Sequence, residues 1–106
     1  MWAVETLNTA VDAEIAALPT DLRARLVRVA NLIEAMGLDQ LPHDTVKHLE
    51  GKLWEIRVKG RTGISRAIYV TATGKRVVIV RVFVKKTQKT PNKELELART
   101  RAKEVR

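Results

Sequence analysis

The residues best suited to chemistry gather at the end of the most apolar stretch of the sequence, where Lys85, Lys86 and Lys89 follow one another closely. Arg81 and Phe83 precede them at alternate positions, and alternate side chains of a strand share a face. An aromatic ring beside cations can stack on a nucleobase while the cations contact phosphates. We therefore expect an open face that binds single-stranded nucleic acid. The alternative is that Phe83 belongs to the core and Arg81 is an ordinary surface charge.

A second candidate is Arg66, which interrupts an otherwise apolar strand face. A guanidinium among apolar neighbours is unfavourable unless it pairs with an acid or faces an anion. Arg66 is therefore either a buried partner of Glu55 or a planar fork that binds a phosphate. Arg57 and Lys59 lie on the polar face of the preceding strand and add further cations near it.

Metal chemistry has little support in the sequence. There is no cysteine, and the two histidines are His43 and His48. Disulfides, thiolate zinc sites and thiol nucleophiles are excluded, and two histidines do not complete a usual zinc site. We expect chemistry that uses no metal and no other cofactor.

The charge of the chain is strongly positive and unevenly distributed. Lys and Arg number 20 against 12 Asp and Glu, which gives a net charge of +8. Residues 1–42 hold 3 basic and 6 acidic side chains, whereas residues 43–106 hold 17 and 6. Such an excess of positive charge in the second part indicates a polyanionic partner, with nucleic acid as the first candidate.

The first part of the chain predicts a short strand and a helical hairpin. Residues 2–7 alternate as a strand does, and Asn8 or Thr9 can cap a helix that follows. Apolar residues at helical spacing predict a second helix that begins near residues 19–21 and ends at Gly37.

The second part predicts antiparallel strands and a last helix. The strands are expected over residues 46–49, 53–59, 64–71 and 76–85. The first strand is short and is predicted to lie at the edge of the sheet. The last strand is predicted to be central, because both of its faces are largely apolar. Thr90 and Pro91 open the final helix by capping and by the preference of proline for the first turn. The predicted class is α+β, with a strand and a helical hairpin packed on a small antiparallel sheet.

Length and hydropathy describe one globular domain. The 106 residues are 45% hydrophobic, and the mean hydropathy is −0.16. No apolar run reaches the roughly 18 residues of a membrane span, and the first residues lack the pattern of a secretory signal. We expect a single domain over residues 1–106 that works in the cytoplasm.

Several segments together resemble a known family. They are residues 49–57 (LEGKLWEIR), 66–69 (RAIY), 82–91 (VFVKKTQKTP) and the closing helix over 94–101. With the two preceding helices, they resemble the RelE/ParE superfamily of bacterial type II toxins, specifically the HigB-like, phage Gp49-like branch. The resemblance implies a RelE-like α+β fold and ribosome-dependent cleavage of mRNA in the ribosomal A site. It also implies a small antitoxin as partner, a HigA-like helix-turn-helix protein in this branch.

The resemblance also assigns residues. By motif, the family's arginines fall on Arg57 and Arg66, and its lysine-rich signature falls on Lys85, Lys86 and Lys89. The catalytic C-terminal tyrosine of some RelE toxins has no counterpart after Tyr69. The histidine-based site of some HigB toxins is matched only loosely, through His48.

Cleavage of RNA without a metal runs by attack of the 2′-hydroxyl on the adjacent phosphate, and it needs a base, an acid and cations. A lysine crowded among cations has a lowered pKa, so Lys85 or Lys86 can act as base or acid, with His48 and Tyr69 as alternatives. The catalytic candidates are Arg57, Arg66, Lys85, Lys86, His48 and Tyr69, and the nucleic-acid-binding candidates are Arg81, Phe83, Lys89 and Lys52.

Two other functions compete with cleavage of mRNA. One is inhibition of DNA gyrase, as in the ParE branch of the same superfamily, where binding replaces RNA chemistry. The other is a basic nucleic-acid-binding domain without catalysis, which the charge alone would allow. The signature over residues 85–91 favours the ribosome-dependent nuclease.

Overall fold

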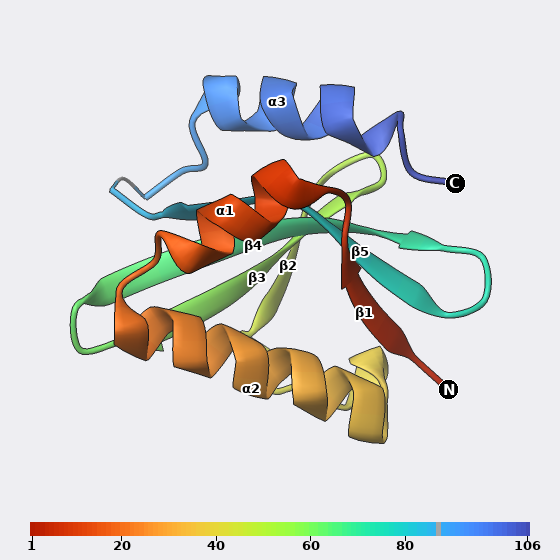
Figure 1. The fold of residues 1–106 in the computed structure, drawn as a ribbon, viewed down its shortest axis with the longest axis horizontal. Helices are drawn as coiled ribbons and strands as arrows, with labels where there is room; N and C mark the ends of the chain where they lie inside the picture. Colours follow the sequence, from red (N-terminus) through yellow and green to blue (C-terminus); the bar gives the residue numbers. More distant parts are fainter. Residues whose placement is uncertain (87) are drawn as a thin grey trace.

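A computed structural model describes residues 1–86 and 88–106, and Figure 1 shows its helices and strands. Within these residues the structure is α+β, as predicted. In chain order, the elements are β1 (Ala3–Thr6), α1 (Thr9–Ala16), α2 (Thr20–Met36), a 3-10 turn (Leu38–Gln40), β2 (Val46–Glu50), β3 (Leu53–Gly60), β4 (Gly63–Ala72), β5 (Arg76–Val84) and α3 (Asn92–Ala102).

The strands form one sheet in the order β1-β5-β4-β3-β2. Strands β2 to β5 pair as antiparallel neighbours, with β2 at the edge as predicted. β1 joins the other side in parallel, with Ala3 opposite Arg76. β5 is therefore an interior strand, although β4 is the middle one.

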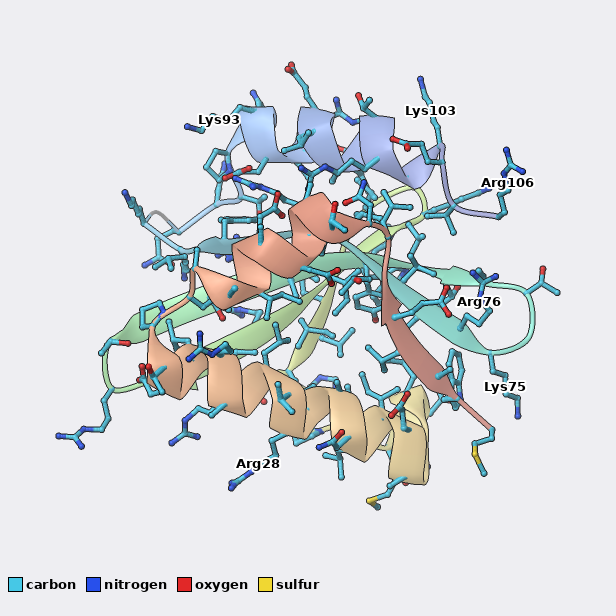
Figure 2. The ribbon with its side chains drawn as sticks, viewed as in Figure 1. Arg28, Lys75, Arg76, Lys93, Lys103 and Arg106 are labelled. Carbon is cyan, nitrogen blue, oxygen red and sulfur yellow. The ribbon has the colours of Figure 1, made fainter. Side chains whose placement is uncertain are left out.

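The two N-terminal helices begin and end as their sequence predicts. The side chain of Asn8 accepts a hydrogen bond from the Val11 amide at 3.1 Å, which makes Asn8 the cap of α1. α2 ends at Gly37, whose φ of 96° suits glycine. Arg28 lies on the outer side of α2 and points away from the sheet (Figure 2). The apolar stripe of α2 is left to face the strands.

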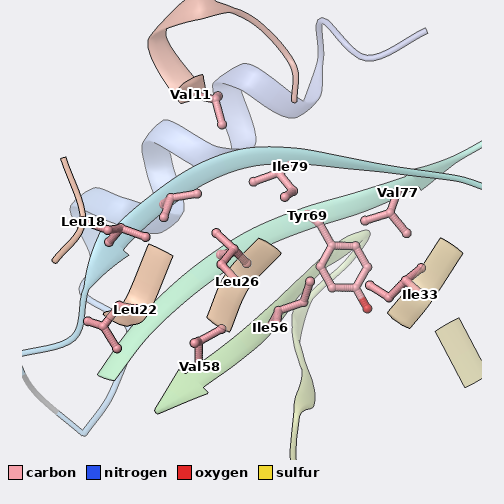
Figure 3. Packing of buried hydrophobic residues seen from close by; sticks show 12 residues of the cluster. Val11, Leu18, Leu22, Leu26, Ile33, Ile56, Val58, Tyr69, Val77 and Ile79 are labelled. Carbon is pink, nitrogen blue, oxygen red and sulfur yellow. The ribbon is translucent and has the colours of Figure 1, made fainter. Parts of the chain in front are cut away.

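The larger core lies between the sheet and helices α1 and α2 (Figure 3). Leu22, Leu26 and Ile33 of α2 are buried in it together with Ile56 of β3 and Tyr69 of β4. A smaller core on the other face includes Ala98 of α3. α3 thus covers one face of the sheet, and α2 covers the other.

One irregularity of the sheet changes which residues share a face. The pairing of β4 with β5 shifts between Ile68 and Tyr69, which leaves Val80 as an extra residue in β5. Past this bulge, Val82 packs in the core of α1 and α2, and Phe83 packs against the core of α3. Strict alternation along residues 76–85 predicts that the valines at 78, 80, 82 and 84 share one face, and this is wrong because the alternation ends at the bulge.

Charged side chains hold the chain on both sides of this bulge. The Val82 amide donates to Glu14 Oε1 of α1 at 3.0 Å, and Arg101 Nη1 of α3 donates to the Val80 carbonyl at 2.9 Å. Arg101 also contacts Glu14 at 2.8 Å. Side chains from α1 and α3 therefore provide hydrogen-bond partners for backbone groups that the bulge removes from the regular pairing of the sheet.

Among the described residues, no helix combines the length and the apolar character needed to cross a membrane.

Candidate nucleic-acid interface

A pocket of about 440 Å³ opens where β5 ends and α3 begins. We call it the lysine pocket. Its cationic lining residues are Arg66, Lys85, Lys86, Lys89 and Lys93. Phe83 and Pro91 contribute apolar surface to the same lining. The fold therefore brings side chains from β4, β5 and the start of α3 to one place.

The charge of the lysine pocket is strongly positive. Its lining contains five cationic residues and one acid, Glu94. That acid is already bound, because Arg81 donates to both of its carboxylate oxygens, at 2.8 and 3.2 Å. Lys93 projects from the first turn of α3 (Figure 2), where the helix dipole also favours an anion. The pocket is suited to a phosphate-bearing ligand.

Lys85 has the most unusual environment among the lysines of the pocket. It is half-buried, and its amide donates to the Ile64 carbonyl at 2.7 Å, which continues the pairing of β5 with β4. Partial loss of solvent lowers the pKa of its ammonium, and the positive charges of Arg66 and Arg57 lower it further. Its neutral amine is therefore more populated at a given pH than that of an ordinary lysine.

Arg66 is held by the protein itself. Its side chain is 2% exposed, and Nη1 lies 3.6 Å from Glu55 Oε2. Nη1 also donates to Thr90 Oγ1, and Nη2 donates to the Gln88 carbonyl at 2.7 Å. Of the two sequence alternatives for Arg66, the structure shows the buried pair with Glu55.

Arg57 stands next to Arg66 across the sheet. The two arginines are direct cross-strand partners on β3 and β4, so their side chains project from the same face. Within the described residues, the half-buried Arg57 leaves its Nε without a hydrogen-bond partner. Its charge adds to that of Arg66 at Lys85.

Arg81 does not present a free cation. It contacts Glu14 of α1 at 2.9 Å as well as Glu94 of α3, and its guanidinium carbon lies 5.9 Å from the centre of the Phe83 ring. The hydrogen bond that Arg81 donates to Glu94 raises the pKa of Arg81 despite partial burial. The expected open face with a free Arg81 is wrong, because α3 covers that part of the sheet. Phe83 is half-buried and still lines the pocket.

Three other predicted site residues lie away from the lysine pocket. Tyr69 is buried in the core under α2, and burial raises its pKa to about 12. The ring of His48 in the edge strand lies 4.8 Å from that of Trp54, tilted by 57°. Trp54 is the cross-strand neighbour of both His48 and Tyr69, so His48 lies on that same face. Lys52 is exposed in the turn between β2 and β3 and lines a hollow near the end of α3, together with Arg106.

Sequence reasoning missed Lys93 in the lining of the pocket and the contacts that Thr90 makes beside it. Lys93 could have been found from its place in the first turn of the predicted last helix. Thr90 was expected to cap that helix, but the helix begins at Asn92 with no side-chain cap. The Thr90 hydroxyl instead donates to Glu55 Oε2 at 3.1 Å. Nothing in the local sequence indicates this pairing across 35 residues.

Within the described residues, no three His, Cys, Asp or Glu side chains lie close enough together to hold a metal ion.

Comparison with known proteins places the chain in a family. No curated protein matches it. The family described as "Phage derived protein Gp49-like" matches residues 13–103, a range that includes every residue of the lysine pocket. This family is one of toxin-antitoxin toxins, whose members have an antitoxin as partner. The chain therefore belongs to the Gp49-like family, within the RelE/HigB-like toxin superfamily.

Proposed function

We propose that the protein is a ribosome-dependent endoribonuclease that cuts mRNA in the lysine pocket and so inhibits translation. The observation that carries the proposal is Lys85, a half-buried lysine with a lowered pKa among the other cations of the lysine pocket. Membership of a toxin family agrees with it. A lysine whose pKa is lowered, set in a cationic pocket, can serve as the base that metal-independent RNA cleavage requires.

The proposed reaction is an attack within the RNA strand. The neutral amine of Lys85 takes the proton of a ribose 2′-hydroxyl, and the 2′-oxygen forms a bond to the adjacent phosphorus. The bond from phosphorus to the 5′-oxygen breaks, which leaves a 2′,3′-cyclic phosphate, and a protonated lysine of the pocket gives its proton to the departing oxygen. The other cations of the pocket offset the negative charge that develops on the phosphate. Arg57 and Arg66 add their positive charges from the sheet below the pocket.

The shape of the surface suits a strand better than a single phosphate. Lys85 and Lys86 also line a neighbouring hollow with Gly63, Ile64 and Gln88. An RNA strand that crosses these two lysines has room for a nucleotide on either side. Phe83 offers the aromatic surface of the lysine pocket to one of the bases.

Dependence on the ribosome follows from what the pocket lacks. Four of its five cationic lining residues are lysines, whose flexible side chains attract a phosphate but do not fix the ribose in line with it. Correct positioning of reacting groups can supply about 7–11 kcal/mol of a barrier. The ribosomal A site, which holds mRNA in one conformation, provides that positioning in the cytoplasm. A small HigA-like antitoxin with a helix-turn-helix is the proposed neutralising partner.

Primer extension on cellular mRNA tests the proposal. The wild-type protein, Lys85→Gln and the matched control Lys75→Gln are expressed in a bacterium. Lys75 lies in the turn before β5, away from the pocket (Figure 2). We expect discrete cuts within codons for wild type and for Lys75→Gln, and none for Lys85→Gln. Trapped DNA breaks without RNA cuts would favour gyrase inhibition, and RNA binding without cuts would favour a non-catalytic domain.

A further inference from the structure

The segment that joins β5 to α3 is fastened by side chains from the sheet. Arg66 donates from Nη1 to the Thr90 hydroxyl and from Nη2 to the Gln88 carbonyl. The Thr90 hydroxyl in turn donates to Glu55 Oε2 at 3.1 Å. Thr90 therefore connects the two members of the buried ion pair, accepting from one and donating to the other.

This segment lies between two regular elements, β5 and α3. The Lys85 amide donates to the Ile64 carbonyl at the end of β5, and the Glu94 amide donates to the Pro91 carbonyl at the start of α3. The same segment carries Lys86 and Lys89 of the lysine pocket. Gln88 and Thr90, which Arg66 contacts, lie on either side of Lys89 in the chain, so these contacts help to place its ammonium group.

The environment of Glu55 is unusual for a side chain whose only role is to stabilise the fold. Its residue is 0% exposed, and its Oε1 has no hydrogen-bond partner among the described residues. A buried carboxylate with an unused oxygen is costly for folding. A negative charge beneath a phosphate pocket also opposes anion binding. A role in placing other groups explains why an acid stands there.

We infer that Glu55 and Thr90 are positioning residues of the proposed RNA site, which hold the segment of Lys86 and Lys89 over Arg66 without touching the RNA. This inference rests on the proposed function. The Thr90 hydroxyl can be removed by itself with the substitution Thr90→Val. Valine has nearly the same shape as threonine, so the Glu55–Arg66 ion pair stays in place. Serine keeps the hydroxyl and is the conservative variant.

Two measurements on wild type, Thr90→Val and Thr90→Ser test the inference. The first is kcat and KM on ribosome-bound mRNA. We expect Thr90→Val to lower kcat by about 10- to 100-fold, the loss expected when a group is misplaced by about 1 Å. KM should change much less, and Thr90→Ser should restore kcat to near wild type.

The second measurement is limited trypsin digestion of the free proteins, followed by mass spectrometry. Cutting after Lys89 should become severalfold faster in Thr90→Val. Cutting after Lys75 in the same digest should not change, because Lys75 lies in the turn before β5, away from the pocket (Figure 2). Thr90→Ser should digest as wild type does.

The outcomes separate the inference from the proposed function. If wild type does not cut ribosome-bound mRNA, the proposed function fails, and the positioning of an RNA-cleaving site fails with it, whatever the digests show. If wild type cuts mRNA but Thr90→Val keeps a wild-type kcat or a wild-type rate of cutting after Lys89, the inference alone is overturned. A loss of kcat that Thr90→Ser does not restore would also overturn it.

Discussion

The carboxylate of Glu55 lies 3.6 Å from Nη1 of Arg66, and the two side chains are 0% and 2% exposed. Each charge has lost its water, so each depends on the other. The pair lies on the face of the sheet that also carries Lys85, whose pKa responds to both charges. Arg66 is therefore part of the buried structure that supports the lysines. Its Nη atoms already bind groups of the protein, so they are not available for bidentate binding of a phosphate.

Removal of one partner should destabilise the fold. We expect Arg66→Ala to lower the free energy of unfolding by about 3–5 kcal/mol, the usual cost of breaking a buried ion pair. Urea denaturation followed by circular dichroism measures this. The surface variant Lys86→Ala serves as the control and should change stability by no more than about 0.5 kcal/mol. Equal denaturation midpoints for the two variants would refute the structural role of Arg66.

Much of the fold could be predicted from the sequence. Asn8 and Gly37 mark helix ends through local chemistry, and the alternation of residues 53–59 defines a strand. The bulge at Val80 could not be predicted, because its supporting side chains, Glu14 and Arg101, come from distant helices.

The candidate site, like the fold, has some features that the sequence predicts and others that it does not. The lysines of residues 85–89 are visible in the sequence because they are neighbours along the chain. The ion pairs of Arg81 with α1 and α3 depend on how three elements meet, and alternation within one strand says nothing of them.

The pH dependence of cleavage should report on Lys85. If its neutral amine is the base, the single-turnover rate rises with pH until the amine is deprotonated, at a pKa below the ordinary 10.5 of lysine. Arg57→Gln removes a cation that lowers this pKa, so the pKa should rise and the rising limb should move to higher pH. Lys103→Gln, at the far end of α3, should leave the profile unchanged (Figure 2). An unshifted profile in Arg57→Gln would count against Lys85 as the base.

Binding to the ribosome should depend on salt through the lysine pocket. Replacing Lys86 and Lys93 together by Gln should flatten the slope of log affinity against log salt by roughly one to two units, since each phosphate contact contributes about 0.7 to 0.9. Pelleting titrations at several salt concentrations measure the slope. The double control Lys75→Gln with Lys103→Gln removes the same charge elsewhere. Equal slopes for the two double variants would mean that only net charge matters.

Residues on the opposite face of the sheet should not take part in catalysis. His48→Ala and Tyr69→Phe should keep cleavage of ribosome-bound mRNA within a few fold of wild type, because both side chains lie on the α2 face, away from the lysine pocket. Tyr69→Phe retains the buried ring, so its stability should also be close to wild type. A loss of kcat in either folded variant would return that residue to the list of catalytic candidates.

The most direct test of the central claim compares one mRNA free in solution and bound in a ribosomal A site, each incubated with purified protein. We expect rapid cutting of the bound mRNA, slow cutting of the free mRNA, and products with a 2′,3′-cyclic phosphate on one side and a 5′-hydroxyl on the other. Lys85→Gln should bind the ribosome and fail to cut. Equal cutting of free and bound mRNA, or full cutting by Lys85→Gln, would contradict the account.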